Sequence, residues 1–433
     1  MIDDGRKGSR IRAARDYFGV GIAMAESTKR WAGVSRALER RNYRLFVAGQ
    51  LVSLMGTWTQ AVAQSWLVYR LTGSALWLGI AVFCQQAPVL FLASFGGLLA
   101  DRHRRRTILV TTQSVAMLLA LVLAALTLSG RVRVAHVLVL ATMLGVSSAF
   151  DSPTRQSFIV ELVGRENLAS AVALNSSMVT GASVVGPAVA GVAIKVLGEG
   201  WCFVANGVSF LAVIAGLLAM HDLPVPAIAS ARESMHSRLL EGYRFVITHE
   251  RIRTLLDLLA LAALLSIPSA TLMPVFASKV LHGDARTLGL LMGTQGAGAL
   301  IAGLTFASRR SERGSYAWIG GACALNGVTL VLFALSHTSW ISIVLMLPLG
   351  AGTMVHVTGT NALIQTLTPD PLRGRVMAIW VMILMGFSPL GSIVLGLVAT
   401  AFDPRLPLIV GGVVCALGAV VFLRWSGHGT RDL

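Results

Sequence analysis

Twelve long apolar segments constrain the fold of this chain more than any other feature of its sequence. Each is close to the roughly 20 residues that an α-helix needs to cross a membrane, and none alternates strictly like a barrel strand of about 10 residues. The chain of 433 residues is 55% hydrophobic and only 13% charged, about half the charge of a soluble domain. A soluble enzyme is therefore excluded, and we predict an all-α integral membrane protein with twelve transmembrane helices. They cover residues 43–70, 75–99, 107–128, 134–150, 168–194, 200–220, 254–278, 285–308, 315–335, 339–364, 376–400 and 405–424.

The positive charges predict how the chain is oriented. Most of the 36 Lys and Arg residues lie in the N-terminal segment, in every second connection between apolar segments and in the C-terminal tail. Short connections rich in Lys and Arg stay in the cytoplasm. We therefore predict a multi-pass protein of the cytoplasmic (inner) membrane with both termini in the cytoplasm. The net charge of +16 is then a topology signal, and no nucleic-acid partner is expected.

An internal repeat divides the chain into two halves. A shift of about 205 residues superposes three glycines of the fifth apolar segment on three glycines of the eleventh. These are Gly181, Gly186 and Gly191, and Gly386, Gly391 and Gly396. Two six-helix bundles in the same orientation, with a substrate site near the middle of the membrane, are expected from such a repeat. The predicted parts are a basic N-terminal segment 1–42, a bundle 43–220, a cytoplasmic linker 221–253, a second bundle 254–424 and a tail 425–433.

Residues 1–42 leave two interpretations open. The segment is basic and has no long apolar core, so it is not a secretory signal peptide. Either translation starts at Met24 and only a short basic lead remains, or the segment contacts anionic lipid at the inner surface.

Several motifs resemble signatures of the major facilitator superfamily. Gly97-Leu-Leu-Ala-Asp101-Arg102-His-Arg104-Arg105-Arg106 is similar to the loop signature between its second and third spans. Asp151-Ser-Pro-Thr-Arg155, Glu241-Gly-Tyr-Arg-Phe245 and the stretch from Asn361 to Arg375 resemble its branch of enterobactin exporters and macrolide efflux proteins. The resemblance covers about residues 42–424. It implies the major facilitator fold of two pseudo-symmetric six-helix bundles, and a transporter rather than an enzyme.

Polar residues form a stripe along the first apolar segment. They recur at intervals of three and four positions, which places them on one face of a helix. In hydrocarbon each unsatisfied polar group costs several kcal/mol, so the stripe must face other helices or a watery space. It either lines the transport pathway, which we favour, or makes hydrogen bonds between helices. The stripe consists of Gln50, Ser53, Thr57, Gln60 and Gln64.

Gln86, Asn206 and Gln295 are further candidates for the pathway, each weighed against a simple tie between two helices. Gln85 precedes Gln86, and neighbouring positions on a helix diverge by about 100°. At most one of these two amides therefore faces the pathway.

The resemblance also implies residues for gating. In the superfamily, the positions matching Asp101 and Arg102 latch the two bundles on the inner side, and Asp151 is the expected partner of Arg102 or Arg105. Arg104 stands where a turn glycine is usual, which is a departure from the pattern. Gly186-Pro187 resembles the fifth-span signature of antiporters and favours export, although close packing alone would explain it. The complete latch set is Gly97, Asp101, Arg102, Arg105, Asp151, Gly186, Pro187, Arg373 and Arg375.

Two ionisable residues inside the apolar segments are candidates for proton coupling. Ionisable groups within spans are costly and point to function, which singles out His356 and Asp257; the alternatives are a neutral packing histidine and an interfacial carboxylate. The chain has no phosphate-binding loop of the type used by ATPases. Its four cysteines lie in apolar runs without disulfide or metal spacing. No catalytic residue, metal or cofactor is expected.

These observations predict a secondary active transporter that works as a monomer. We expect it to export a small amphiphilic molecule, such as a siderophore or a drug-like compound, by proton antiport with alternating access. The expected partners are that small molecule, protons and membrane lipid. A proton-linked nutrient importer is the alternative within transport, and a membrane sensor or scaffold is the alternative of another class. The scaffold needs no polar stripe.

Overall fold

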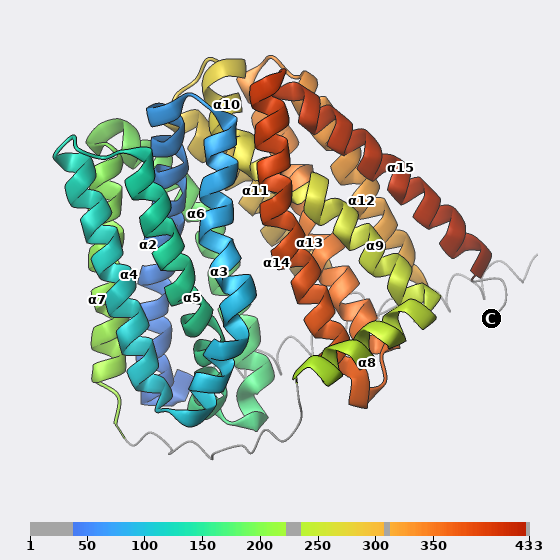
Figure 1. Ribbon diagram of the computed structural model, residues 1–433, viewed down its shortest axis with the longest axis horizontal. Coiled ribbons are helices and arrows are strands. Elements are labelled where there is room, and N and C mark those ends of the chain that lie inside the picture. The colour runs from blue at the N-terminus through green and yellow to red at the C-terminus, as the bar shows by residue number, and fades with distance from the viewer. Residues whose placement is uncertain (1–37, 222–234, 307–311, 430–433) are drawn as a thin grey trace, which may run out of the picture.

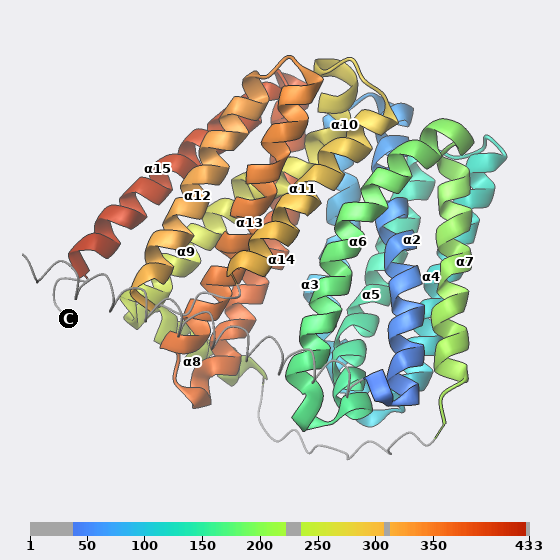
Figure 2. The same cartoon turned by 180° about the vertical axis from the view of Figure 1, so that it is seen from behind.

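A computed structural model describes residues 38–221, 235–306 and 312–429, and these residues form helices and no strand (Figure 1). The segment 1–37 lies outside the described residues, so neither interpretation of the N-terminus is tested. The helices form two bundles that meet at one end of the molecule and separate at the other, as both views show (Figures 1 and 2).

The first bundle contains six helices, which begin and end within three residues of the first six apolar segments, except that the fourth continues from its predicted end at residue 150 to Val163. Gly73, with a φ of 61°, turns the chain between the first two. The helix α2 packs on α6 and α7, and α5 packs on α3 and α4. The six are α2 (Arg41–Thr72), α3 (Ala75–Arg102), α4 (Arg105–Leu128), α5 (Val134–Val163), α6 (Leu168–Leu197) and α7 (Glu199–Leu218).

The second bundle repeats this arrangement. The helix α12 packs on α13 and α15, and α14 packs on α9. Its elements are α9 (Glu250–Leu265), α10 (Met273–Val275), α11 (Ala285–Phe306), α12 (Glu312–Leu335), α13 (Ser339–Leu367), α14 (Asp370–Ala401) and α15 (Arg405–Gly429).

The described residues contain eleven helical segments that are long and apolar enough to cross a membrane. The polar helix α2 is not among them, although its 32 residues exceed the length of a span. Its stripe of amides and hydroxyls lowers its hydropathy. Its place inside the first bundle identifies it as a transmembrane helix as well, which brings the number of spans to twelve. The predicted all-α membrane fold is thereby confirmed.

The seventh span is broken, which the sequence analysis did not predict. After α9 the chain forms a 3₁₀ turn, Ile267–Leu272, then α10, and then a π-helical turn, Phe276–Val280. Pro268 and Pro274 lie in this stretch, and a proline within a helix removes a backbone donor and clashes with the preceding turn. The regular helix therefore ends at Leu265.

The predicted linker 221–253 contains a helix that the sequence analysis also missed. This helix, α8 (Met235–Thr248), lies across one end of the second bundle and packs on α14 and α9 (Figure 1). Gly242 approaches the backbone of Arg375 in α14. We call the end of the molecule that holds α8 and the α3–α4 turn the linker end, and the other the opposite end.

The two bundles meet through two helix pairs, α6 with α11 and α3 with α14. Their closest approaches lie toward the opposite end, where a Cβ atom on Gly289 would lie 2.5 Å from the carbonyl oxygen of Pro187. A Cβ on Gly79 of α3 would collide with the carbonyl oxygen of Ser392 in α14. Because glycine has no side chain, these backbones can pack tightly.

The internal repeat relates equivalent contacts in the two bundles. Gly186 of α6 packs against Trp58 of α2, and Gly391 of α14 packs against Leu264 of α9. The shift of about 205 residues carries one pair of positions onto the other. Gly191 and Gly396 form a second equivalent pair, and each faces the other bundle, Gly191 at α11 and Gly396 at α3.

Candidate functional site

A polar cavity of about 200 Å³ lies inside the first bundle. Its wall is formed mainly by α2, α4, α5 and α7, and it includes all five residues of the predicted stripe. Gln50, Ser53 and Gln60 are buried, Gln64 is half-buried and Thr57 is exposed. The stripe therefore faces a shared interior and not acyl chains, as its hydrogen-bonding needs require.

Asp151 organises the charge of this cavity. It is 7% exposed and accepts hydrogen bonds from Thr112 Oγ1 at 2.9 Å and Gln113 Nε2 at 2.8 Å. Arg155, one turn further along α5, lies 3.3 Å from its other carboxylate oxygen and also donates to Gln50 Oε1 at 3.3 Å. An ionised carboxylate can remain buried because these groups compensate its charge. The expected partners Arg102 and Arg105 are not the ones that Asp151 contacts.

A second polar group ties α2 to α7. Asn206 Nδ2 donates to Gln60 Oε1 at 2.7 Å, and Ser209 donates to Asn206 Oδ1 at 3.1 Å. Asn206 is 2% exposed and also lines the cavity. At Gln60 and Asn206 the side chains thus make the interhelical tie that was the alternative to a pathway contact.

The remaining pathway candidates lie elsewhere. Gln85, and not Gln86, lines the cavity of the first bundle. Gln86 is half-buried in α3. In the second bundle Gln295 is half-buried in α11, where its carbonyl oxygen faces Gly350 of α13.

A larger cleft, of about 1090 Å³, separates the two bundles. Its walls are residues 83–94 of α3 and residues 371–390 of α14, so it lies on the linker side of the contact between Gly79 and Ser392. Flexible and aromatic apolar side chains dominate the lining, together with Arg375. The large members are Phe83, Phe91, Met382, Met385 and Phe387.

The predicted latch residues at the linker end have the following partners. Arg105 of α4 pairs with Glu161 of α5 and lies 3.9 Å from Asp101. Arg373 pairs with Asp370 at 2.6 Å and donates to the carbonyl oxygen of Gln365.

Other latch positions complete the picture at this end. Arg375 pairs with Glu241 of α8, which ties the linker helix to α14. Arg102 is exposed, and Gly97 is half-buried with open space where a Cβ would stand. Gly186 and Pro187, which resemble the fifth-span signature of antiporters, both lie at close contacts. Gly186 packs against Trp58, and the carbonyl oxygen of Pro187 faces Gly289 of α11.

Polar contacts between the bundles at the opposite end were missed by the sequence analysis. Lys195 Nζ of α6 lies 2.5 Å from Asp284 Oδ2, just before α11. Thr400 of α14 accepts a hydrogen bond from the backbone N–H of Leu76 at 3.0 Å. The hydrogen bond from Lys195 is the main cause that holds the pKa of Asp284 below its ordinary value, and backbone N–H groups of α11 add to it. Periodicity within a helix carries no information about such pairs.

The coupling candidates occupy contrasting environments. His356 of α13 is 1% exposed, and neither of its ring nitrogens has a hydrogen-bond partner among the described residues. Asp257 is exposed on α9. Buried polar groups normally have partners, so His356 is the more unusual of the two.

Nothing in the described part of the chain holds three metal-ligating side chains together. All four cysteines are free thiols.

Comparison with known proteins identifies the family. A family model described as transmembrane secretion effector matches residues 32–428. The chain is 26% identical to the staphyloferrin A transporter of Staphylococcus aureus, over 83% of this chain and 90% of that protein. It is 25% identical to the multidrug efflux pump Tap of Mycolicibacterium fortuitum, over 86% and 94%. Identity to the enterobactin exporter EntS of Citrobacter koseri is also 25%, over 86% and 85%.

The fold has a close counterpart among solved structures. A mutant of the nucleoside transporter NupG superposes with a TM-score of 0.71 at 14% identity, over 89% of this chain and 99% of that one. The resemblance inferred from the loop motifs is thus confirmed, and with it a transporter rather than an enzyme. The chain belongs to the transmembrane secretion effector family of major facilitator superfamily transporters.

Proposed function

We propose that this protein exports a small amphiphilic molecule, a siderophore or a drug-like compound, by alternating access of its two bundles. The observation that carries the proposal is the cleft of about 1090 Å³ between α3 and α14, lined by Phe and Met side chains. Methionine adapts its shape to varied apolar partners, and a polar cavity lies close by in the first bundle. The multidrug efflux pump and the enterobactin exporter among the relatives support the same cargo class and direction, and the staphyloferrin A transporter supports the cargo class.

We propose that the linker end faces the cytoplasm, with both termini on that side and the protein acting as a monomer. The concentration of Lys and Arg in the connections at this end supports the orientation. Open at the linker end and closed at the opposite end, the molecule is then ready to load cargo from the cell interior.

Closure of the linker end brings the latch residues together in this proposal. The helices α3 and α14 run antiparallel, with Gly79 opposite Ser392 and Ala75 beside Gly396. Continuing that register places Asp101 beside the first turn of α14, where Arg373 and Arg375 lie. Opposite charges there stabilise the closed state by the small amount that an exposed ion pair contributes.

Proton antiport is the proposed energy source. Asp151 is buried with Arg155 and lines the polar cavity, and a proton on this carboxylate releases Arg155 from its partner. His356 is a second proposed proton site, because it is buried in the second bundle. Asp257 remains a third.

Transport into inside-out vesicles tests the proposed direction. An accumulation screen of siderophores and antibiotics in cells with and without the gene first identifies a cargo. Inside-out vesicles carrying the protein should then accumulate that cargo when their interior is acidified, and a protonophore should abolish the uptake. Uptake only into right-side-out vesicles would establish an importer instead.

A substitution in the second bundle tests the coupling of transport to protons separately from the direction of transport. His356→Ala should reduce uptake driven by the pH gradient at least tenfold and leave exchange of labelled for unlabelled cargo intact. Uptake that still follows the pH gradient would remove the histidine from the coupling mechanism.

A further inference from the structure

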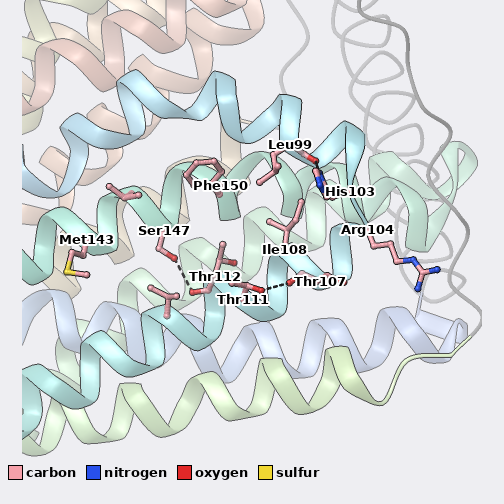
Figure 3. A pocket seen from close by; sticks show the side chains of 12 residues that line it. Leu99, His103, Arg104, Thr107, Ile108, Thr111, Thr112, Met143, Ser147 and Phe150 are labelled. Atoms are coloured by element: carbon pink, nitrogen blue, oxygen red, sulfur yellow. Dashed lines mark hydrogen bonds between the residues drawn. The ribbon is translucent and has the colours of Figure 1, made fainter.

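The first bundle carries another hollow, of about 720 Å³, lined by residues of α3, α4 and α5 (Figure 3). The helices α3 and α4 diverge from their turn at His103 and Arg104, and α5 forms the floor between them. The apolar wall consists of Leu99, Ile108, Val115, Met143, Val146 and Phe150.

The hollow has the length of one membrane leaflet. It extends along α4 from Arg104 to Val115, which at 1.5 Å per residue is about 16 Å. Half of the hydrocarbon core is about 15 Å thick. Because the chain spans a membrane, a hollow of this length beside its helices lies at the depth of one acyl chain.

The walls offer few hydrogen bonds to a polar guest. Thr111 Oγ1 donates to the carbonyl oxygen of Thr107 at 3.0 Å, and Thr112 Oγ1 donates to Asp151 at 2.9 Å. Ser147 Oγ donates to the carbonyl oxygen of Thr112 at 3.0 Å, as Figure 3 shows. Since these three hydroxyl protons are already used within the protein, the wall beyond Thr107 suits a hydrocarbon chain better than a polar solute.

The rim at the linker end carries the positive charge of Arg104. His103 and Arg104 line that end of the hollow and are exposed (Figure 3). Neither a hydrogen bond nor an ion pair engages the Arg104 side chain within the part of the chain that the structure describes, whereas the nearby Asp101 faces Arg105 at 3.9 Å. Arg104 also stands at the position where the resembling loop signature has a glycine. The charge is therefore available to an anion at the headgroup level.

We propose that this hollow binds a membrane phospholipid with an anionic headgroup. One acyl chain occupies the groove between α3 and α4, and the phosphate lies at Arg104 and His103. A basic side chain near an anionic lipid surface strengthens lipid binding about fivefold. Burial of the acyl chain against the apolar wall of the groove adds to the affinity. A free phosphate or a neutral lipid satisfies only one of these two features.

Native mass spectrometry of the delipidated full-length protein tests this site. The protein is titrated with phosphatidylglycerol, with phosphatidylcholine of the same acyl chains, and with glycerol phosphate. Wild type should bind phosphatidylglycerol about fivefold more tightly than phosphatidylcholine, and glycerol phosphate should not bind. Arg104→Gln should remove that preference, while Met143→Trp, which fills the groove, should weaken both lipids.

Matched variants separate the site from general attraction to lipid. Arg131→Gln changes an exposed arginine in the turn that follows α4, and Leu211→Trp adds an indole at an exposed position of α7, a helix that does not line the groove. Both should bind phosphatidylglycerol like wild type. Equal affinity of wild type for the two lipids, or an equal loss in Arg131→Gln and Arg104→Gln, would overturn the proposal. So would groove binding that appears only after residues 1–37 are deleted, because that segment would then be the occupant.

Discussion

Asp151 is the residue on which the charge balance of the first-bundle cavity depends. Its carboxylate faces Arg155, Thr112 and Gln113, so neutralising it leaves Arg155 without its counter-charge. Asp151→Asn should therefore reduce uptake driven by a pH gradient at least tenfold. Exchange of cargo in the absence of a gradient should be preserved. The measurement is flux in reconstituted vesicles under both conditions.

The control for this prediction is another buried carboxylate of the same bundle. Glu199 pairs with Arg70 at 2.7 Å at the opposite end of the molecule and does not line the cavity. Glu199→Gln should leave the pH dependence of transport unchanged. Equal loss of coupling in both variants would indicate a general need for charge in the bundle and not a proton site.

Gln60 supports a prediction in which stability and transport separate. Removal of its amide in Gln60→Leu leaves the buried Asn206 amide without its acceptor, which costs about 1–3 kcal/mol. The double variant Gln60→Leu/Asn206→Leu should recover much of that loss in thermal stability, because no unpaired amide remains. If Gln60 also lines the pathway, transport stays impaired in the double variant; restored transport would make it a structural tie only.

The periodicity of the stripe shows what the sequence can and cannot reveal at this scale. Spacing alone placed the polar side chains of α2 on one face, and in the structure these residues line the cavity of the first bundle. It could not pair Gln60 with Asn206, which lies 146 positions away, or turn Asp151 toward Thr112 and Gln113 of α4. Such pairings depend on how α4, α5 and α7 rotate about their axes, and no local pattern records that rotation.

Among the elements, α6 and α11 form one of the two close contacts between the bundles. A Cβ on Gly289 would lie 2.5 Å from the carbonyl oxygen of Pro187, closer than two such atoms can approach. Gly289→Val should therefore separate the helices at the opposite end and favour the state open on that side. Distances between spin labels on the ends of α6 and α11 should lengthen.

A glycine with free space provides the comparison. A Cβ on Gly321 of α12 would meet nothing within 4 Å, so Gly321→Val should leave the distance distribution unchanged. If Gly289→Val also leaves it unchanged, the close approach at α6–α11 does not control which side is open.

The elements also differ in how well the sequence foretold them. Apolar runs predicted the spans because a membrane requires about 20 apolar residues in each. They did not reveal α8, whose helix is stabilised by packing on α14 and by the pair of Glu241 with Arg375. The break of the seventh span was equally hidden, since its apolar composition continues through Pro268 and Pro274.

On the scale of the whole molecule, two bundles related by the repeat are joined at one end by few polar contacts. Lys195 and Asp284 form such a contact, and both side chains are partly exposed, so the pair contributes about 0.2–1 kcal/mol. Alternating access requires that small energies of this size hold the closed end, because a stronger latch would trap one state. The pair thus belongs to the balance between two states and not to the stability of either bundle.

The last prediction concerns this pair and its response to pH. Lys195→Met should raise the population open at the opposite end about two- to fivefold, and the exchanged pair Lys195→Asp/Asp284→Lys should restore it. Arg70→Met, which breaks an ion pair within one bundle at the same end, should have no effect.

The hydrogen bond from Lys195 lowers the pKa of Asp284 below its ordinary value of 3.8. The stabilisation by the ion pair of Lys195 with Asp284 is therefore complete above pH 3.8. It is lost only as the pH falls through the lowered pKa of Asp284. Spin-label distances should show no change from this pair between pH 5 and 8; a shift in that range that disappears in Asp284→Asn would contradict this assignment.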